Sequence, residues 1–186
     1  ILSRQQTLIN SVNQHMQSYH LHAVVMQIES FLDDLTNTYI RLNRARFWAE
    51  GMEEDKAQAY TCLDTILQQL CILMAPFTPF LSEKIYQQRQ AALGETDKLA
   101  SIHMHRYPQA DLDRKDATLE HGVATMQQIL LLGRQARNDA KIKIKTPLQK
   151  LSIIHGDDKT LDALKPVLDI IQRELNVKEI LLTTEE

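Results

Sequence analysis

The sequence predicts a mainly α-helical protein: a helical bundle over about residues 1–112, followed by a small α+β subdomain over about residues 113–186. Two observations lead to this prediction. In the first part, apolar residues recur at steps of three and four, which is the spacing of one helix face. After residue 139 they alternate or form short runs, which is typical of β-strands. The charged run DLDRKD at 111–116 marks the expected boundary.

The first helices of the bundle have clear periodicity. Apolar residues predict one helix over about 2–19 and a longer one over about 20–50. Gly51 supplies a stop signal for the second helix. Asp55 is expected to cap a third helix, which continues to Met74 with a broad apolar face that suits the interior of a bundle.

Two prolines interrupt the helical pattern after the third helix. Pro76 and Pro79 cannot lie within a helix without breaking it, so we expect a turn here. Pro79 fits the first turn of a fourth helix, with Thr78 as its cap. Residues 90–115 then predict a connector that contains short extended pieces.

The subdomain is expected to contain a long helix, three short strands and one further helix. The helix covers about 116–139, and the strictly alternating KIKIK at 141–145 predicts the first strand, which Pro147 ends. The remaining elements are a strand over 151–155, a helix over 161–175 weakened by Pro166, a strand over 177–182 and an acidic tail.

The composition excludes several classes of protein. The 186 residues are 44% hydrophobic and 24% charged, which is ordinary for a globular domain and too apolar for a disordered chain. Two cysteines, nine residues apart, cannot form a disulfide framework or a cysteine-rich zinc site. The formal net charge of −3 gives no global reason to expect nucleic acid, so any such function depends on local patches.

The sequence also gives expectations about location and completeness. No apolar run approaches the roughly 18 residues that a membrane helix needs, and no signal-like amino terminus is present. We therefore expect a cytoplasmic protein with no membrane partner. Because the sequence opens at Ile1 inside a helical pattern, we also expect a piece of a longer protein.

The first candidate binding surface lies in the second predicted helix. Its members follow steps of four, three and four, so they share one face of an α-helix: Asn37, Arg41, Arg44 and Trp48. Guanidinium groups suit phosphate contacts, and an indole suits base stacking. A solvated helix face is the alternative. Arg46 projects into the apolar stripe instead, so we expect it to form a structural ion pair with an acid from another helix or from the rest of the parent protein.

The second candidate surface is a basic segment at 134–150. It contains one acid, Asp139, and six basic residues: Arg134, Arg137, Lys141, Lys143, Lys145 and Lys150. The apolar stripe of the preceding helix becomes basic near Gly133, which suggests that the helix end leaves the core and faces solvent or a polyanion. Lysines that stabilise a helix carboxyl terminus or protect an edge strand are the alternatives.

We predict no catalytic or metal site in the chain. His103 and His105 alternate on an expected extended piece, but no cysteine or carboxylate cluster joins them. Cys62 and Cys71 fall in a helical pattern and are expected to be packed thiols. The sequence contains no phosphate-binding glycine loop, nucleophile elbow or zinc-protease motif.

Several segments, taken together, resemble the carboxyl-terminal region of the isoleucyl-tRNA synthetases. They are FLDDLTNTYIRLNRARFW at 31–48, LMAPFTPFLSEKIY at 73–86, SIH at 101–103, LGRQAR at 132–137 and IKTPL at 144–148. The resemblance covers nearly the whole chain. The APFTPF break alone also fits the valyl, leucyl and methionyl relatives, whereas the segment that ends in Arg46-Phe47-Trp48 points to the isoleucyl family. IKTPL and ELNVK at 174–178 are similar to its longer, eukaryote-like branch.

The resemblance implies a class Ia anticodon-binding domain, whose helical bundle packs on the anticodon stem-loop of a tRNA. The parent enzyme would attach isoleucine to its tRNA with ATP and magnesium, and its catalytic and editing domains would lie upstream. This chain would therefore be non-catalytic, would hold no cofactor, and would contact the upstream catalytic domain. The arginine-rich segment and the segment from Gly133 to Arg137 match two motifs of the family.

Two departures from the family concern positions within this surface. Relatives often carry tryptophan where this chain has Thr38 and arginine where it has Ala45, so no RNA contact is carried over to either position. The cysteine-rich zinc-binding tail of some bacterial relatives is also absent from this sequence. The same domain of a valyl or another class Ia synthetase remains an alternative, as does a helical module that docks acidic protein partners.

Overall fold

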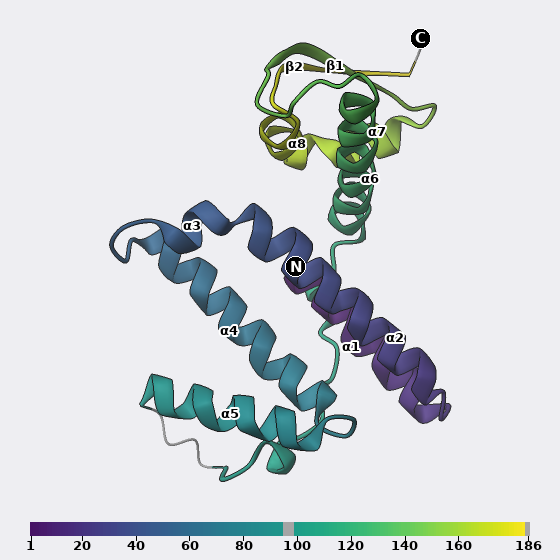
Figure 1. Cartoon of the computed structure of the whole chain (residues 1–186). Coiled ribbons are helices and arrows are strands. Elements are labelled where there is room, and N and C mark those ends of the chain that lie inside the picture. Colours follow the sequence, from purple (N-terminus) through teal and green to yellow (C-terminus); the bar gives the residue numbers. More distant parts are fainter. Residues whose placement is uncertain (95–98, 185–186) are drawn as a thin grey trace. The chain divides into compact units, whose positions relative to one another are not determined.

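The computed structural model describes residues 1–94 and 99–184, and its contacts divide the chain into two compact units, 1–115 and 116–186 (Figure 1). The model is mainly helical with one small sheet, so the predicted fold class is confirmed. The acidic tail at 185–186 and part of the expected connector, 95–98, lie outside the described residues. Within the described part of the chain, no helix is long and apolar enough to span a membrane.

The first unit is a bundle of helices. Its main helices are α1 (Leu2–Gln17), α2 (Leu21–Asp33), α4 (Glu54–Met74) and α5 (Pro79–Leu93). Helix α1 packs against α2 and α4, and α4 packs against α5 (Figure 1). Shorter helical segments complete the unit: η1 (Asp34–Ile40), α3 (Arg44–Trp48), η2 (Ile102–Met104) and η3 (Leu112–Arg114).

The periodic apolar residues of the sequence form the core of this unit. The largest buried cluster takes residues from α1, α2, η1 and α4: Leu8, Ile9, Val12, Val24, Ile28, Phe31, Leu35, Ile66, Leu70 and Leu73. A second cluster joins Cys71 and Ala75 to Tyr86 and Ile102. Pro79 begins α5 and Thr78 occupies its N-cap position, as the sequence predicts. Ile102–Met104 form a single 3₁₀ turn, so the extended piece on which His103 and His105 are expected to alternate does not form there.

The long helix expected over 20–50 is interrupted. Helix α2 passes into the π-helical segment η1, and the chain turns at Asn43 before α3 begins. The Thr36 hydroxyl donates a hydrogen bond of 2.8 Å to the Leu32 carbonyl and so competes with backbone donors for that oxygen. In a π-helical turn each backbone hydrogen bond spans five residues instead of four. The side chains that follow therefore point in other directions than in a continuous α-helix.

The second unit places a long helix beside a parallel two-stranded sheet. Helix α6 (Ala117–Asp139) packs against α7 (Asp158–Leu164), the 3₁₀ turn η4 (Lys165–Val167) and α8 (Leu168–Leu175). Strand β1 (Leu148–Ile154) pairs in parallel with β2 (Val177–Thr183), with Leu148 opposite Val177 and Ile153 opposite Leu182. Pro166 lies in η4 and separates α7 from α8, at the weak point that the sequence indicates.

Two glycines allow α6 to approach its neighbours closely. A Cβ atom on Gly122 would lie 2.1 Å from the carbonyl oxygen of Ala163, which is a severe clash with backbone. A Cβ atom on Gly133 would lie 2.6 Å from Cδ1 of Leu175. Helix α6 therefore packs closely against α7 at Gly122 and against α8 at Gly133.

The strand expected at 141–145 is wrong. Lys141 has a left-handed backbone with φ of 56°, and the amide of Ile142 donates to the Arg137 carbonyl at the end of α6. The amide of Thr146 then closes a turn on the Lys143 carbonyl. Because these local hydrogen bonds hold residues 141–146 as a loop, no ladder forms until Leu148. We call residues 141–146 the lysine loop.

Candidate nucleic-acid interface

The short helix α3 is fixed to the bundle through the ring of Phe47. This ring is buried and meets Tyr39 and Tyr60 edge-on, with centroid distances of 6.2 and 5.3 Å. The Tyr60 hydroxyl also lies 3.4 Å from the Phe47 carbonyl, to which it donates. Burial raises the pKa of the Tyr39 hydroxyl, so this ring remains a neutral packing group. One face of α3 is therefore committed to the core.

Arg46 fixes the same helix to the start of α4. Its Nε and Nη2 atoms donate to the two carboxylate oxygens of Asp55 at 2.7 and 2.6 Å, which is a bidentate ion pair. Nη1 donates to the side chain of Asn43 at 2.9 Å. The hydrogen bond from Arg46 lowers the pKa of the Asp55 carboxyl. Asp55 is therefore an ion-pair partner and does not cap α4, since Glu53 occupies the N-cap position.

Arg44 and Trp48 lie on the outer face of α3. They are separated by one helical turn, and the guanidinium carbon of Arg44 lies 4.8 Å from the centroid of the Trp48 ring. This is the geometry of a cation–π contact. Trp48 nevertheless remains 74% exposed. Such a surface can accept a planar, electron-rich group against the indole and an anion against the guanidinium.

Asn37 and Arg41 form a separate pair at the end of η1. The Arg41 Nε atom donates to the Asn37 carbonyl at 2.8 Å, and the Asn37 amide donates to the carboxylate of Asp33. Both side chains are exposed. The single continuous face expected from α-helical spacing is wrong, because the π-helical turn and the break at Asn43 divide its residues into two pairs.

The basic segment of the second unit contains two arginines with structural contacts. Arg134 donates to the carboxylate of Glu174 at 2.7 Å. Arg137 is only 5% exposed, and its guanidinium donates to the carbonyls of Lys143, Thr146, Leu175 and Asn176 at 2.6–3.2 Å. The expectation that the end of α6 offers Arg137 to solvent is therefore wrong. Its hydrogen bonds are used to join the lysine loop to the end of α8.

The lysines of this segment have a different environment. Lys141, Lys143 and Lys145 are exposed, and among the described residues none of them has an acidic partner within ion-pair distance. Lys150 lies on β1 and is exposed as well. The structure therefore leaves three closely spaced ammonium groups in contact with solvent.

The histidines do not come together as metal ligands. The Nε2 atom of His105 lies 3.2 Å from the hydroxyl of Tyr86, and His103 is exposed in η2. Across the two described ranges, no group of three or more histidine, cysteine or carboxylate side chains could hold a metal ion. Cys71 is buried and Cys62 is half-buried, and both are free thiols.

Sequence reasoning missed the partners that decide these roles. Asp55 follows Arg46 by nine residues, and Glu174 follows Arg134 by forty, so neither pair has a helical spacing that would reveal it. One local signal was available in Asn176. Asparagine directly after a predicted helix indicates a left-handed cap, and Asn176 has φ of 49° there.

Comparison with known proteins gives a family over most of the chain. A family model described as the anticodon-binding domain of tRNA ligase matches residues 1–153. The isoleucine–tRNA ligase of Bdellovibrio bacteriovorus is 39% identical over 186 residues, which are 100% of this chain and 17% of that protein. The isoleucine–tRNA ligase of Clostridium kluyveri is 38% identical over 185 residues, again 100% of this chain and 17% of the relative.

The similarity extends to eukaryotes. The cytoplasmic isoleucine–tRNA ligase of Saccharomyces cerevisiae is 37% identical over 192 aligned residues, which cover 100% of this chain and 18% of that protein. The resemblance to isoleucyl-tRNA synthetases is therefore confirmed. The chain spans less than a fifth of the length of these curated relatives.

Proposed function

The chain belongs to the family of anticodon-binding domains of tRNA ligases, and we propose that it is the part of an isoleucine–tRNA ligase that binds the anticodon stem-loop of the tRNA for isoleucine. The attachment of isoleucine, with ATP and magnesium, is assigned to the rest of the parent enzyme, which contacts this domain. The domain itself takes no part in the chemistry. We also propose that the parent enzyme acts in the cytoplasm.

The observation that carries the proposal is the exposed Trp48 ring beside Arg44. Single-stranded loops of RNA are recognised through unstacked bases that stack on aromatic and guanidinium planes. An indole is a large stacking plane, and Trp48 is the single tryptophan of the chain. The anchors at Phe47 and Arg46 hold the helix, so the indole does not have to be ordered when RNA binds.

In this proposal Arg41 and Arg44 contact phosphates, and Trp48 stacks on a base of the anticodon loop. Asn37, which lies beside Arg41, supplies an amide for a base or sugar contact. Phosphate contacts release counterions, so affinity should fall as the salt concentration rises. We assign Arg46 and Arg137 to the scaffold, since their guanidiniums are occupied by protein acceptors.

The test is a titration of labelled anticodon stem-loops from isoleucine and valine tRNAs with this chain, at several salt concentrations. We expect the isoleucine stem-loop to bind more tightly and its affinity to fall with salt. Loss of a stacked base is worth about 1–3 kcal/mol, so Trp48→Ala should weaken binding by about 5- to 150-fold, and Trp48→Phe should weaken it less.

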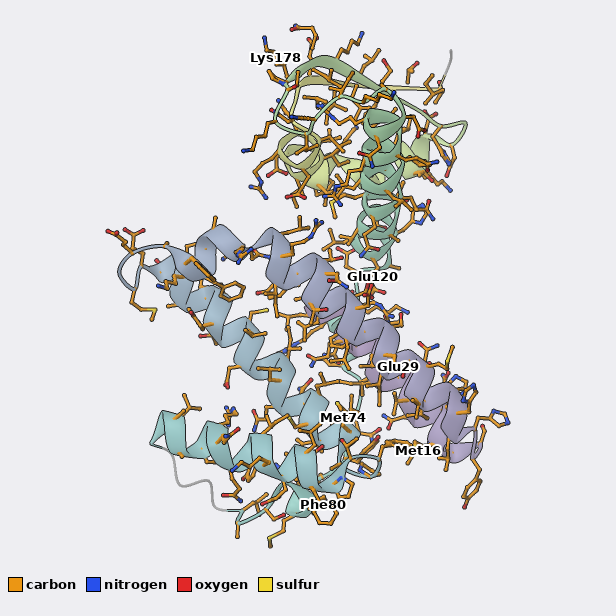
Figure 2. The ribbon with its side chains drawn as sticks, in the orientation of Figure 1. Met16, Glu29, Met74, Phe80, Glu120 and Lys178 are labelled. Carbon is orange, nitrogen blue, oxygen red and sulfur yellow. The ribbon has the colours of Figure 1, made fainter. Side chains whose placement is uncertain are left out.

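A matched control is available within the same unit. Phe80 is 90% exposed on α5 and lies at the opposite end of the unit from α3 (Figure 2). Phe80→Ala removes an aromatic ring that is even more exposed than Trp48 and should leave RNA binding unchanged. Absence of binding by the wild-type chain at low salt would overturn the proposal. Equal effects of Trp48→Ala and Phe80→Ala would overturn the assignment of the surface.

A further inference from the structure

The end of helix α6 carries a residue that does not suit its backbone conformation. The amide of Ile142 donates to the Arg137 carbonyl and that of Lys141 donates to the Asn138 carbonyl, which is the double hydrogen bond of a Schellman motif. The residue at the left-handed position of this motif is Lys141, with φ of 56°. Glycine is the usual residue there, because a Cβ atom makes the left-handed conformation unfavourable.

Two other helix ends in the described residues have the same left-handed backbone: Tyr19 after α1, with φ of 57° and the same pair of hydrogen bonds, and Asn176 after α8. Asn176 follows α8 with φ of 49°, but asparagine tolerates this region, and here its side chain also donates to the Ile144 carbonyl at 3.0 Å. No hydrogen bond or ion pair is found for the Lys141 side chain within the described ranges, where it is exposed. The backbone hydrogen bonds of the motif therefore hold Lys141 in this conformation, and its ammonium remains available to a ligand.

The lysine loop is held in one shape from its inner side. The Arg137 guanidinium donates to the carbonyls of Lys143 and Thr146, and Asn176 donates to that of Ile144. Because three successive parts of the loop are fixed by their carbonyls, the lysine side chains remain on the solvent side. Lys141, Lys143 and Lys145 are thus presented by a rigid turn, and a flexible tail would present them at a higher entropic cost.

We propose that the lysine loop is a phosphate-binding surface that the second unit adds to the RNA interface, and that the ammonium of Lys141 contacts the RNA backbone. This inference rests on the proposed function, since the polyanion is the tRNA. Arg137 is a positioning residue for this surface. The contacts are to phosphates and therefore independent of base sequence.

Two features of the loop argue against its lysines being purely structural. Edge-strand protection does not apply, because residues 141–146 form no strand. A cation at the end of a helix is favoured by the macrodipole, but a glycine at this position would remove the backbone strain.

Three substitutions of Lys141 separate binding from strain. Lys141→Ala removes the charge and keeps a Cβ atom, Lys141→Gly removes both, and Lys141→Arg keeps both. We expect alanine and glycine to weaken binding of full-length isoleucine tRNA equally and to lower the slope of log affinity against log salt by about 1. Arginine should preserve both quantities. Glycine alone should raise the melting temperature, by about 2–4 °C, as measured by circular dichroism.

The triple variant Lys141→Ala, Lys143→Ala, Lys145→Ala extends the test without disturbing buried groups. For the wild-type chain, the ratio of the affinity at 50 mM salt to that at 200 mM salt should be larger by about 3.5-fold for each phosphate contact. The triple variant, which lacks three contacts, should therefore show a ratio about 40-fold smaller than the wild-type chain. Lys159→Ala is the matched control. Lys159 is an exposed lysine on α7. Helix α7 packs beside Gly122 near the start of α6, whereas the lysine loop follows the end of α6.

The outcomes distinguish this inference from the proposed function. If the wild-type chain binds tRNA and the triple variant binds with the same affinity and salt slope, the lysine loop is not part of the interface and the stem-loop proposal stands. A loss confined to isoleucine tRNA, with valine tRNA unaffected, would contradict phosphate contacts. A lower melting temperature in both the alanine and glycine variants, with unchanged RNA affinity, would show that Lys141 acts only on the helix macrodipole and would overturn the inference.

Discussion

Asp55 receives both guanidinium hydrogen bonds of Arg46, at 2.7 and 2.6 Å, and this ion pair joins the short helix α3 to the first turn of α4. The ion pair fixes the orientation of α3 and therefore of the other side chains on it. Phe47 turns into the core, while Arg44 and Trp48 remain outside. The candidate RNA surface therefore depends on a contact that includes no RNA-binding residue.

The Arg46–Asp55 pair should make the mobility of Trp48 depend on pH. The pKa of Asp55 is lower in the folded chain than in the unfolded one, so its contribution to stability is present above the unfolded pKa, about 4, and is lost as pH falls through the folded value. We expect the fluorescence anisotropy of Trp48 to fall as the pH is lowered below about 4. Asp55→Asn should give the lower anisotropy at neutral pH as well. An identical pH profile in the variant would show that another group controls α3.

Arg137 should matter to the stability of the second unit far more than Arg134. Replacement of Arg137 by Met leaves the buried Leu175 carbonyl and the Thr146 carbonyl without the guanidinium donor, which we expect to cost about 2–3 kcal/mol. Arg134→Met removes a partly exposed ion pair and should cost less than about 1 kcal/mol.

The two units can be followed separately in this experiment. All tyrosines and the tryptophan lie before residue 116, so fluorescence reports only the first unit, whereas circular dichroism reports both. The unfolding of the second unit is therefore the part of the dichroism transition that has no counterpart in fluorescence. Arg137→Met should lower the urea midpoint of this part. Similar midpoints for the two variants would contradict a structural role for the buried guanidinium.

Gly122 should tolerate no side chain. The Cβ atom of an alanine would lie 2.1 Å from a backbone oxygen of α7, and backbone atoms cannot move aside as a flexible side chain can. Overpacking costs about 1–3 kcal/mol, against a gain of about 1 kcal/mol in helix propensity. We therefore expect Gly122→Ala to lower the free energy of unfolding of the second unit. Gly156→Ala, where nothing lies within 4 Å, is the control and should change it little.

Loss of Arg41 and Arg44 should weaken RNA binding without unfolding the bundle. Both side chains are exposed, so we expect Arg41→Ala with Arg44→Ala to keep the melting temperature. The slope of log affinity against log salt should fall by about 1.4–1.8, which corresponds to two phosphate contacts. Lys84→Ala with Arg106→Ala removes two exposed cations elsewhere in the unit and is the charge-matched control. Unchanged affinity in the first variant would remove these arginines from the interface.

Periodicity was sufficient to predict most of the fold. The buried residues of α1, α2 and α4 follow the steps of three and four seen in the sequence, since burial of one helix face decides both. The prolines at 76, 79 and 166 also act through local sterics, and each lies where a helix ends, begins or is broken.

Contacts between distant segments could not be predicted in this way. Arg137 continues the stripe of α6, which indicates its direction, but its acceptors come from the lysine loop and from the end of α8. The alternation at 141–145 has the pattern of a strand, yet Lys141 adopts a left-handed conformation that no glycine or asparagine announces. The π-helical turn at Asp34–Ile40 is likewise not revealed by helix spacing.

The most direct test of the central claim is the emission of Trp48 during a titration with the anticodon stem-loop of isoleucine tRNA. Since Trp48 is the single tryptophan, its signal has no other source. We predict that the stem-loop quenches Trp48 with the same midpoint as the binding measured by labelled RNA, and that the valine stem-loop requires higher concentrations. Binding of labelled RNA without any change in Trp48 emission would contradict the account, because the RNA would then occupy a surface that excludes α3.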